Sequence, residues 1–229
     1  KKESGTSLMG IVGKGTSDSN EEYYLALNDS QIYFDVGKDG GPYIQQNASI
    51  KIGKWQHISA VHNRINGISS LKVFLDGEDV GGTTINPSNT PNENNYPISI
   101  GSRFSTSLNH PFKGQIDDVQ IWKKALTDSE IKDRMYRTID QSDPLWNDLS
   151  GYYKMDWGQG NTAFDYSAKG NHGTLTNGPD WVEAYSWERG MVAHYPLDGS
   201  GRDIHGTHSG SLIGTTPTTN MHGYSQKAL

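Results

Sequence analysis

Cysteine is absent from the 229-residue sequence, which excludes disulfide bonds, thiol catalysis and cysteine-held metals. No apolar run approaches the ~20 residues of a membrane-spanning helix, and the first residues lack the apolar centre of a signal peptide. Insertion into a membrane is therefore not expected. The lack of cysteine fits the cytosol and equally a bacterial surface protein that folds without disulfides, so the redox compartment stays open.

Positive charge is also scarce, because 20 Lys and Arg stand against 26 Asp and Glu, for a net charge of −6 with no basic cluster. Nucleic acid and anionic membranes are not expected as partners, since the overall field would not attract them. Calcium or a neutral sugar fits this charge better. The apolar fraction is only 33% and 27 residues are glycine, a composition typical of short strands joined by many turns. An all-β fold is therefore favoured over a helix bundle.

Alternating and β-branched segments, separated by turn residues, predict successive strands in the first part of the chain. The clearest hairpin is at Asp76-Gly77, because a type I′ turn needs positive φ and this dipeptide adopts it at little cost. The predicted strands are Leu8–Val12, Tyr23–Asn28, Gln31–Val36, Trp55–His62, Leu71–Leu75, Ile98–Ile100 and Gln115–Trp122.

The last of these strands runs directly into a predicted helix. On a regular strand Asp117 faces the same side as Val119 and Ile121, which predicts an inward carboxylate that needs a partner. Thr127 and Glu130 have the spacing of a capping box, so a short surface helix is expected to begin there and to end near Arg137.

Four segments in this order resemble the laminin-G-like jelly-roll domains of secreted and surface proteins: Gly53–Val61, Lys72–Gly77, Ile98–Ser102 and Gly114–Ile131. The resemblance covers roughly residues 8 to 137. It implies an all-β, concanavalin A-like antiparallel β-sandwich, a jelly roll with one short surface helix. It also implies a domain that is usually non-catalytic and often carries a calcium ion at its edge.

The remaining third contains an internal repeat, which we call the hook. Tyr153, Asp156, Asp165 and Leu175 of the first hook recur, with spacings changed by a few residues, as Tyr195, Asp198, Asp203 and Leu212 of the second hook. The expected organisation is a jelly roll lacking its opening strands at 1–145, a closing hook segment at 146–189, and the opening segment of a following or complementing module at 190–229. The chain is then a fragment of a tandem array.

The candidate metal ligands are Asp117, Asp165 and Asp203. The last two lie in glycine-bracketed turns, which expose carbonyl oxygens, and calcium prefers a mixture of carboxylate and carbonyl oxygens. A calcium site is predicted from Asp117 with Asp165 or Asp203. The alternative is that the turn aspartates only accept hydrogen bonds from turn N–H groups.

Tyr43 is the candidate ligand-binding residue, because flat aromatic rings stack on sugar faces and a position after Gly40-Gly41-Pro42 is expected in a loop. Tyr23, Tyr24 and Tyr33 are expected on early strands where one sheet face is solvated, and packing is the competing role for all these tyrosines. His57 and His62 differ by an odd number of residues, so they face opposite sides of a strand and cannot share a metal there. His57 is expected to be a hydrogen-bonded core histidine.

Catalytic motifs are missing from the sequence, including the Glu-x-Asp-x-x-Glu strand of related glycan-cleaving sandwiches. The favoured interpretation is a non-catalytic, calcium-stabilised binding or adhesion module of a multi-domain extracellular or cell-surface protein that recognises a glycan or a surface protein. One alternative is a stalk or filament subunit that self-associates through donated strands. Another is an accessory module of a larger glycan-degrading enzyme.

Overall fold

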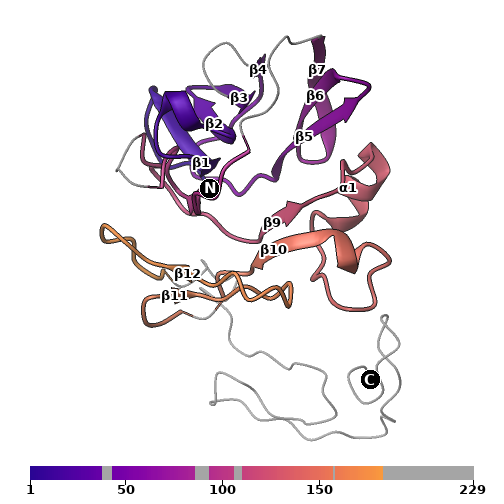
Figure 1. Ribbon diagram of the computed structural model, residues 1–229. Helices are drawn as coiled ribbons and strands as arrows, with labels where there is room; N and C mark the ends of the chain where they lie inside the picture. The colour runs from indigo at the N-terminus through magenta and orange to yellow at the C-terminus, as the bar shows by residue number, and fades with distance from the viewer. Residues whose placement is uncertain (38–42, 86–92, 106–109, 157, 183–229) are drawn as a thin grey trace, which may run out of the picture. The chain divides into compact units, whose positions relative to one another are not determined.

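The computed structural model describes residues 1–37, 43–85, 93–105, 110–156 and 158–182. Two antiparallel sheets form the main layers (Figure 1). The larger sheet has the strand order β4-β3-β2-β1-β8, and the smaller one the order β5-β6-β7. The strands of the larger sheet are β1 (Leu8–Lys14), β2 (Tyr23–Asn28), β3 (Gln31–Val36), β4 (Tyr43–Asn47) and β8 (Ile98–Ile100). Those of the smaller sheet are β5 (Ile58–Ile65), β6 (Ile68–Leu75) and β7 (Glu78–Ile85).

Shorter elements complete the described part of the chain. Strand β9 (Val119–Trp122) pairs with β10 (Leu149–Tyr153), and β11 (Thr162–Ala163) pairs with β12 (Gly173–Thr174). The helix α1 (Asp128–Arg134) lies between β9 and β10 in the sequence, and two short 3-10 turns occupy η1 (Asp18–Asn20) and η2 (Trp146–Asp148). The fold is therefore an all-β sandwich with one α-helix among the residues described, as predicted.

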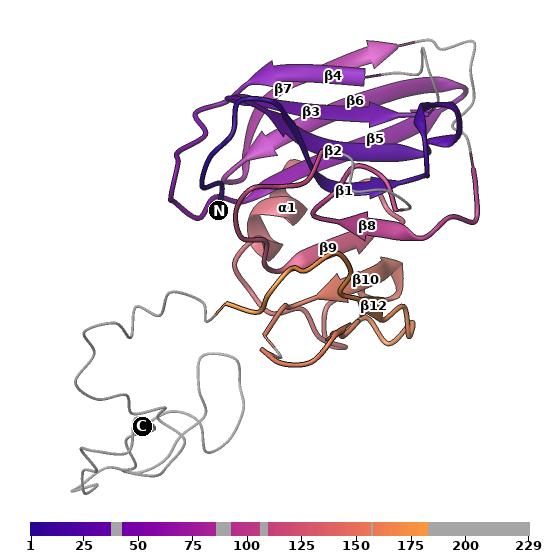
Figure 2. The ribbon, with the colours of Figure 1, turned by 90° about the vertical axis from the view of Figure 1, so that its left-hand side faces the viewer.

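The core lies between the two sheets, whose layers are seen one in front of the other in Figure 2. Alternation along the strands places one set of side chains in this core, because successive residues of a strand point to opposite faces. The buried members are Met9, Leu27, Ile32, Phe34, Val36, Ile44, Leu71, Val73 and Leu75. The other face of the larger sheet is accordingly its outer face.

The predicted hairpin at Asp76-Gly77 is confirmed. Asp76 has φ 51° and Gly77 has φ 78°, the two positive angles of a type I′ turn, and β6 pairs with β7 on either side of it. The predicted strands over 23–28, 31–36 and 98–100 also have the observed bounds. Strand β4 and the strands after α1 were not predicted.

The predicted strand Gln115–Trp122 is wrong in its first half, because β9 begins at Val119. Lys113 and Gln115 instead bond to the chain's first residues, with Glu3 N donating to Lys113 O at 3.0 Å and Gln115 N to Lys1 O at 2.8 Å. Asp118 then has φ 49°, which turns the chain before β9. Asp117 is exposed as a result, so the prediction of an inward carboxylate at this position is also wrong.

The capping box at the start of α1 is confirmed. Thr127 Oγ1 accepts from Glu130 N at 3.2 Å, and Glu130 Oε2 accepts from Thr127 N at 2.8 Å. The helix ends at Arg134, one turn before the predicted end near Arg137. Ile131 is buried on this short helix, so the box fixes the first turn of an element that packs through its apolar side.

Two compact units divide the chain, Lys1–Pro179 and Asp180–Leu229. The repeat of the first hook, from Tyr153 to Leu175, lies in the first unit, and Tyr153 is the last residue of β10. The domain boundaries predicted at 145/146 and 189/190 stay predictions. The second hook, with Asp203, lies outside the described residues.

Candidate functional site

Three tyrosines share the outer face of the larger sheet. In the strand register Tyr24 lies opposite Asp35, which in turn lies opposite Tyr43 on β4. Tyr33 is two residues before Asp35 on β3 and therefore has the same orientation. Three neighbouring strands thus place Tyr24, Tyr33 and Tyr43 side by side, and we call this set the tyrosine row.

The rings of the tyrosine row are nearly parallel. The Tyr24 and Tyr33 centroids are 5.4 Å apart with planes at 10°, and those of Tyr33 and Tyr43 are 5.6 Å apart with planes at 6°. This is the offset-stacked arrangement that aromatic quadrupoles prefer. Exposure increases along the row from 3% at Tyr24 to 54% at Tyr43 on the edge strand. One face of the Tyr43 ring contacts Tyr33, so the opposite face is the one left for a ligand.

Arg103 closes the buried end of the row. Its guanidinium carbon lies 4.2 Å from the Tyr24 centroid and 4.7 Å from that of Phe104. Arg103 Nε bonds to Glu21 Oε2 at 2.9 Å, and Arg103 Nη2 pairs with Asp18 Oδ1 at 2.6 Å. The guanidinium is therefore bonded to two carboxyl groups while it stacks between rings.

Burial dominates the acid–base behaviour at this end of the row. Glu21 is only 1% exposed, and burial raises the pKa of its carboxyl to about 8 against the opposing effect of Arg103. Burial likewise raises the pKa of the Tyr24 and Tyr33 hydroxyls, so both stay protonated near neutral pH. The row therefore presents hydroxyl groups, not phenolates.

Two glycines of β1 allow Arg103 to reach this position. A Cβ on Gly10 would lie 2.3 Å from Arg103 N, and one on Gly13 would lie 2.0 Å from Arg103 O. Residues three apart on a regular strand face opposite sides, but the register of β1 shifts between Gly10 and Val12. This bulge turns both glycines to the backbone of Arg103, so the segment can lie directly on the strand.

Amide side chains flank the exposed end of the row on the same face. Gln31 Nε2 donates to Asn47 Oδ1 at 3.0 Å, and Gln45 Nε2 donates to Gln31 Oε1. Gln45 and Asn47 alternate with core-facing residues on β4, as Tyr43 does, and both are exposed. The surface beside Tyr43 therefore offers neutral donors and acceptors next to an aromatic face, the combination that binds a sugar ring.

Tyr43 was predicted in a loop, and the structure corrects this placement, because Tyr43 is the first residue of β4. Its exposed ring is what the predicted role as a stacking platform requires. Tyr24 and Tyr33 were expected on early strands with one solvated sheet face, and both lie on the outer face of the larger sheet. Arg103 and Glu21 were not singled out from the sequence. The alternation of Tyr33 and Asp35 with buried residues of β3 could have marked the outer face, whereas nothing in the sequence marked Arg103.

Asp165 is the centre of the turn in the first hook. Its Oδ1 accepts from Tyr152 N and Ser167 N, each at 2.9 Å, and its Oδ2 accepts from Ser167 Oγ and Asn171 N, each at 2.9 Å. Although burial alone would raise it, these bonds hold the pKa of the Asp165 carboxyl below its ordinary value. Such bonding is the alternative that the sequence left open, a turn aspartate that accepts N–H groups.

Asp117 and Asp165, the two predicted calcium ligands among the described residues, have separate hydrogen-bond partners. Asp117 is exposed and accepts from Asp118 N at 3.0 Å, and Asp203 lies outside the described residues. The acceptor positions of Asp165 are taken by protein donors, so an ion there would have to replace these hydrogen bonds. Within the described ranges no group of three or more His, Asp or Glu side chains has the arrangement to hold a metal.

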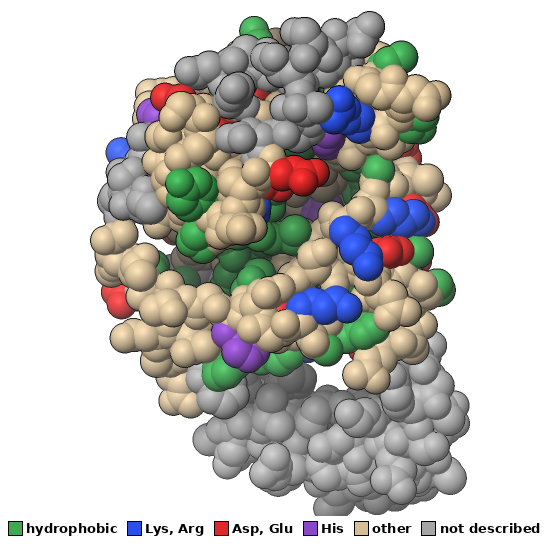
Figure 3. All heavy atoms as spheres, in the orientation of Figure 1, with side chains coloured by type: hydrophobic (Ala, Val, Ile, Leu, Met, Phe, Trp, Pro, Cys, Tyr) green, Lys and Arg blue, Asp and Glu red, His purple; other side chains and the backbone are tan. Residues whose placement is uncertain are grey.

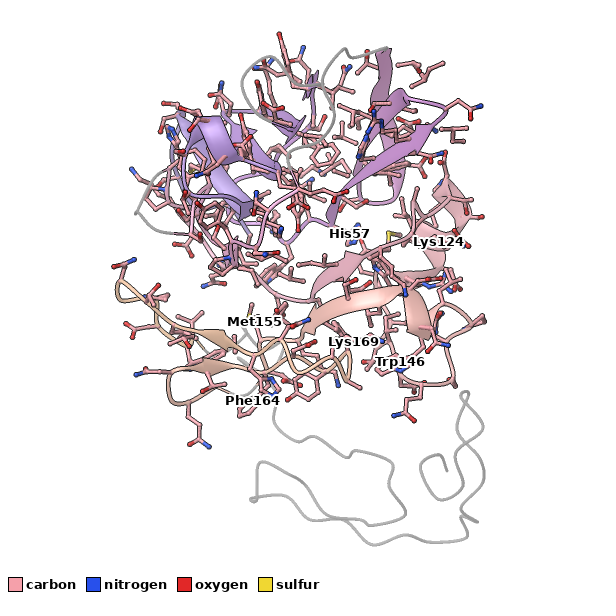
Figure 4. All side chains as sticks on the ribbon, viewed as in Figure 1. His57, Lys124, Trp146, Met155, Phe164 and Lys169 are labelled. Carbon is pink, nitrogen blue, oxygen red and sulfur yellow. The ribbon has the colours of Figure 1, made fainter. Side chains whose placement is uncertain are left out.

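The two histidines near β5 have different environments. His62 shares the core-facing side of its sheet with Leu71 and its Nε2 is 3.0 Å from Ser69 Oγ. His57, labelled in Figure 4, packs edge-on against Tyr136 with centroids 6.4 Å apart. Its buried Nδ1 has no hydrogen-bond partner, so the prediction of a hydrogen-bonded His57 is wrong for this atom. Burial lowers the pKa of both imidazoles, which favours their neutral forms.

A polar cavity of about 440 Å³ lies at the rim of the larger sheet, between the ends of β1 and β2 and the segment before β8. Lys14 Nζ bonds there to Glu22 Oε2 and to Asn94 O. Lys14 and Glu22 neutralise each other, and the cavity has little apolar lining. The residues that line it are Lys14, Glu22, Glu93, Asn94 and Asn95.

Two antiparallel sheets around one core, with aromatic and amide side chains on an outer face, define a lectin-like β-sandwich. The chain belongs to the concanavalin A-like lectin/glucanases superfamily, because a laminin G family model of that description matches residues 2–132, more than half of the sequence. Among curated proteins none matches.

Solved structures share the fold. One, from Bacteroides ovatus and provisionally named a carbohydrate binding protein, aligns with a TM-score of 0.53 at 17% identity over 74% of this chain. The present chain spans 54% of the length of that protein. In the part of this chain that the structure describes, no helix has the length and hydrophobicity needed to cross a membrane.

Proposed function

We propose that this chain is a non-catalytic carbohydrate-binding module in which a sugar ring stacks on the outward face of Tyr43. The observation that carries the proposal is the tyrosine row, which holds the Tyr43 ring in a fixed orientation while leaving it 54% exposed. A ring already ordered by packing loses little entropy on binding. Gln45 and Asn47 supply hydrogen-bonding groups beside it.

A non-catalytic role agrees with the state of the carboxylates at the row. Glycoside hydrolysis needs two carboxyl groups that reach the scissile bond. Glu21 is 1% exposed and bonded to Arg103, so it has no access to a glycan chain. Asp35 lies on the same face, between Tyr24 and Tyr43 in the register, and the exposed Asp18 beside Tyr24 is paired with Arg103 at 2.6 Å.

Replacement of Tyr43 by Ala tests the site. Binding to an oligosaccharide identified on a glycan array should weaken by about tenfold or more, since about 1.4 kcal/mol corresponds to a factor of ten and ring stacking contributes energies of this order. Tyr43→Phe keeps the ring and should change affinity by less than about threefold. Isothermal titration calorimetry measures both variants.

Tyr136→Ala is the matched control, because Tyr136 is the most exposed of the described tyrosines at 74% and lies beyond α1, away from the larger sheet. It should bind as the unchanged protein does. Equal affinities for the Tyr43→Ala and unchanged proteins would move the site elsewhere, with the polar cavity at Lys14 and Asn94 as the next candidate. Hydrolysis of any glycan by the chain would refute the non-catalytic role.

We also propose that calcium binds through Asp117 and a turn aspartate. Calcium that binds only the folded state, at a hundredfold excess over its dissociation constant, adds about 2.7 kcal/mol of stability. The melting temperature should then rise by about 5–10 °C over that in chelator, and Asp117→Asn should abolish the rise. An unchanged melting temperature would leave these aspartates as hydrogen-bond acceptors alone.

An adhesion role at the cell surface or outside the cell extends this proposal, with a glycan or a surface protein as the partner. Self-association by strand donation is the competing role. Figure 3 shows hydrophobic side chains in a hollow between the sheet of β1 and the sheet of β5, a surface that a donated strand could cover. Light scattering of the full chain distinguishes a monomeric binder from an assembling subunit.

A third role is that of an accessory module in a larger glycan-degrading enzyme. The sequence that flanks the chain decides this alternative.

A further inference from the structure

Strand β4 is an outermost strand of the larger sheet (Figure 2), and among the residues that the structure describes it pairs with β3 alone. We call its other side the free edge of β4. We infer that an extended, unbranched glycan chain binds along this free edge, parallel to the strand and with several sugars in contact. The inference rests on the proposed sugar site at Tyr43, which lies at one end of the edge.

Backbone groups of alternate residues point to the free edge. Ala48, directly after β4, donates from its N–H to Ser30 O at 2.8 Å, directly before β3, so these residues form a hydrogen-bonded pair of the antiparallel ladder. Such pairs alternate with non-hydrogen-bonded pairs, whose N–H and C=O groups point away from the partner strand. Along β4 this alternation directs the backbone groups of Tyr43, Gln45 and Asn47 to the free edge.

The same three residues carry the exposed side chains of β4. Tyr43, Gln45 and Asn47 are exposed, whereas Ile44 is buried between the sheets. Successive members are two residues or about 7 Å apart, so the set covers about 13 Å along the strand. This length exceeds that of one sugar ring. The edge is therefore a row of uncharged donors and acceptors that begins at an aromatic platform.

The tyrosine row determines the direction in which a bound chain can continue. Tyr33 lies against one face of the Tyr43 ring, with centroids 5.6 Å apart, and Tyr24 extends the stack over the sheet. A sugar on the opposite face of Tyr43 cannot extend across the sheet, because the row occupies that side. The described donors and acceptors nearest to it continue along β4 toward Asn47, so the chain is expected to run parallel to the strand.

The straightness of β4 indicates the shape of the glycan. The β3–β4 register continues without a shift from Asn47 to Tyr43, whereas the β1–β2, β6–β7 and β9–β10 pairings each contain one. A strand without a bulge keeps its outward residues on one line. A cellulose-like or mannan-like chain is extended and can follow this line, whereas an amylose-like chain coils away from it. The ligand class is therefore an extended, ribbon-like glycan.

The first test measures affinity against chain length. Isothermal titration calorimetry uses cello-, manno- and xylo-oligosaccharides from the monosaccharide to the hexasaccharide, and malto-oligosaccharides for comparison. The best extended series should gain at least about tenfold in affinity from disaccharide to tetrasaccharide, because the added sugars form further hydrogen bonds, and should then level off. Maltohexaose should bind at least about tenfold more weakly than the hexasaccharide of that series.

Asn47→Ala tests the end of the edge farthest from Tyr43. It should weaken binding of the best hexasaccharide by about three- to tenfold and that of the disaccharide by less than about twofold, since only the longer chain reaches this residue. Asn63→Ala is the matched control, because Asn63 is an exposed asparagine on β5 of the smaller sheet. It should bind both sugars as the unchanged protein does.

Gln45→Pro tests the backbone contacts. Proline lacks an N–H and is tolerated on an edge strand where that N–H would face solvent. Gln45→Ala keeps the backbone donor, so Gln45→Pro should bind the hexasaccharide a further threefold or so more weakly while melting at a similar temperature. A much lower melting temperature for Gln45→Pro alone would mean that this N–H bonds within the protein, and would overturn the assignment of the edge.

The outcomes separate the inference from the proposed function. Tyr43-dependent binding that does not strengthen with chain length, that prefers the malto-series, or that is confined to other glycans overturns the edge assignment and leaves the sugar site intact. Binding that does not respond to Tyr43→Ala, or no binding to any sugar, overturns both. Concentration-dependent assembly that Gln45→Pro abolishes, without length-dependent sugar binding, assigns the edge to an added peptide strand and also overturns the inference.

Discussion

Asp165→Ala is expected to lower the free energy of unfolding by at least about 3 kcal/mol, one of the two largest effects predicted for this chain. Asp165 is 6% exposed and accepts bonds from Tyr152 N, Asn171 N and both donors of Ser167. Its removal leaves buried N–H groups without an acceptor, and each such group costs about 1–3 kcal/mol. Thermal unfolding should show a melting temperature lower by about 6–12 °C.

Asp156→Ala is the control for this experiment. Asp156 is in the same hook and is exposed, and it accepts a long hydrogen bond from Tyr166 OH at 3.3 Å. Its removal should change stability by less than about 0.5 kcal/mol, as for most surface substitutions. An Asp165→Ala protein as stable as the Asp156→Ala protein would show that the turn does not depend on the central carboxylate.

Asp143→Ala is expected to destabilise the chain by about 3–5 kcal/mol. Asp143 is 4% exposed, pairs with Arg134 Nη2 at 2.8 Å, and also accepts from Arg137 Nη2 and from Leu145 N. Arg134 on α1 is itself 6% exposed, and the carboxylate left to it would be the exposed Asp133, 3.6 Å from its Nη1. The buried charge would therefore lose its buried partner, which is the costly way to break an ion pair. Chemical denaturation measures the loss as a lower midpoint with an unchanged m-value.

Two controls isolate the buried charge as the cause. Asp133→Ala removes an acid whose side chain is 61% exposed and that also pairs with Arg137, and it should cost less than about 1 kcal/mol. The double variant Asp143→Leu with Arg134→Met replaces the pair by apolar groups and should recover much of the stability. A double variant no more stable than Asp143→Ala would mean that the hydrogen bond to Leu145 N, and not the stranded charge, sets the cost.

Local signals predicted the elements that depend on neighbouring residues. The hairpin at Asp76-Gly77 and the capping box of Thr127 and Glu130 are correct, because a turn or a cap is decided by positive φ or by bonds three residues apart. The strand predicted over Gln115–Trp122 was only half correct. Its first residue, Gln115, bonds to Lys1, more than a hundred positions away, and a local pattern does not contain that pairing.

In the candidate site, too, local sequence signals predicted some features and long-range pairing decided the others. The sequence singled out Tyr43 because its ring could stack on a sugar, and the structure leaves that ring exposed. Tyr33 is nine residues after Tyr24 and ten before Tyr43, and only the cross-strand register stacks the three rings. Asp165 was singled out for calcium, whereas the structure gives its carboxylate four protein donors.

Composition, turn residues and alternation by themselves determined the all-β class, most strands of the two sheets, the capped start of the helix, and the scarcity of positive charge that argues against nucleic acid as a partner. Tertiary structure alone decided which tyrosines form a row and how Gly10 and Gly13 admit the backbone of Arg103. It also decided that Asp117 is exposed, whereas Asp143 and Asp165 are buried. The physical reason is the separation along the sequence over which each interaction acts. Backbone preferences act over a few residues, whereas stacking, charge pairing and burial depend on strand register and loop packing that join distant parts of the chain.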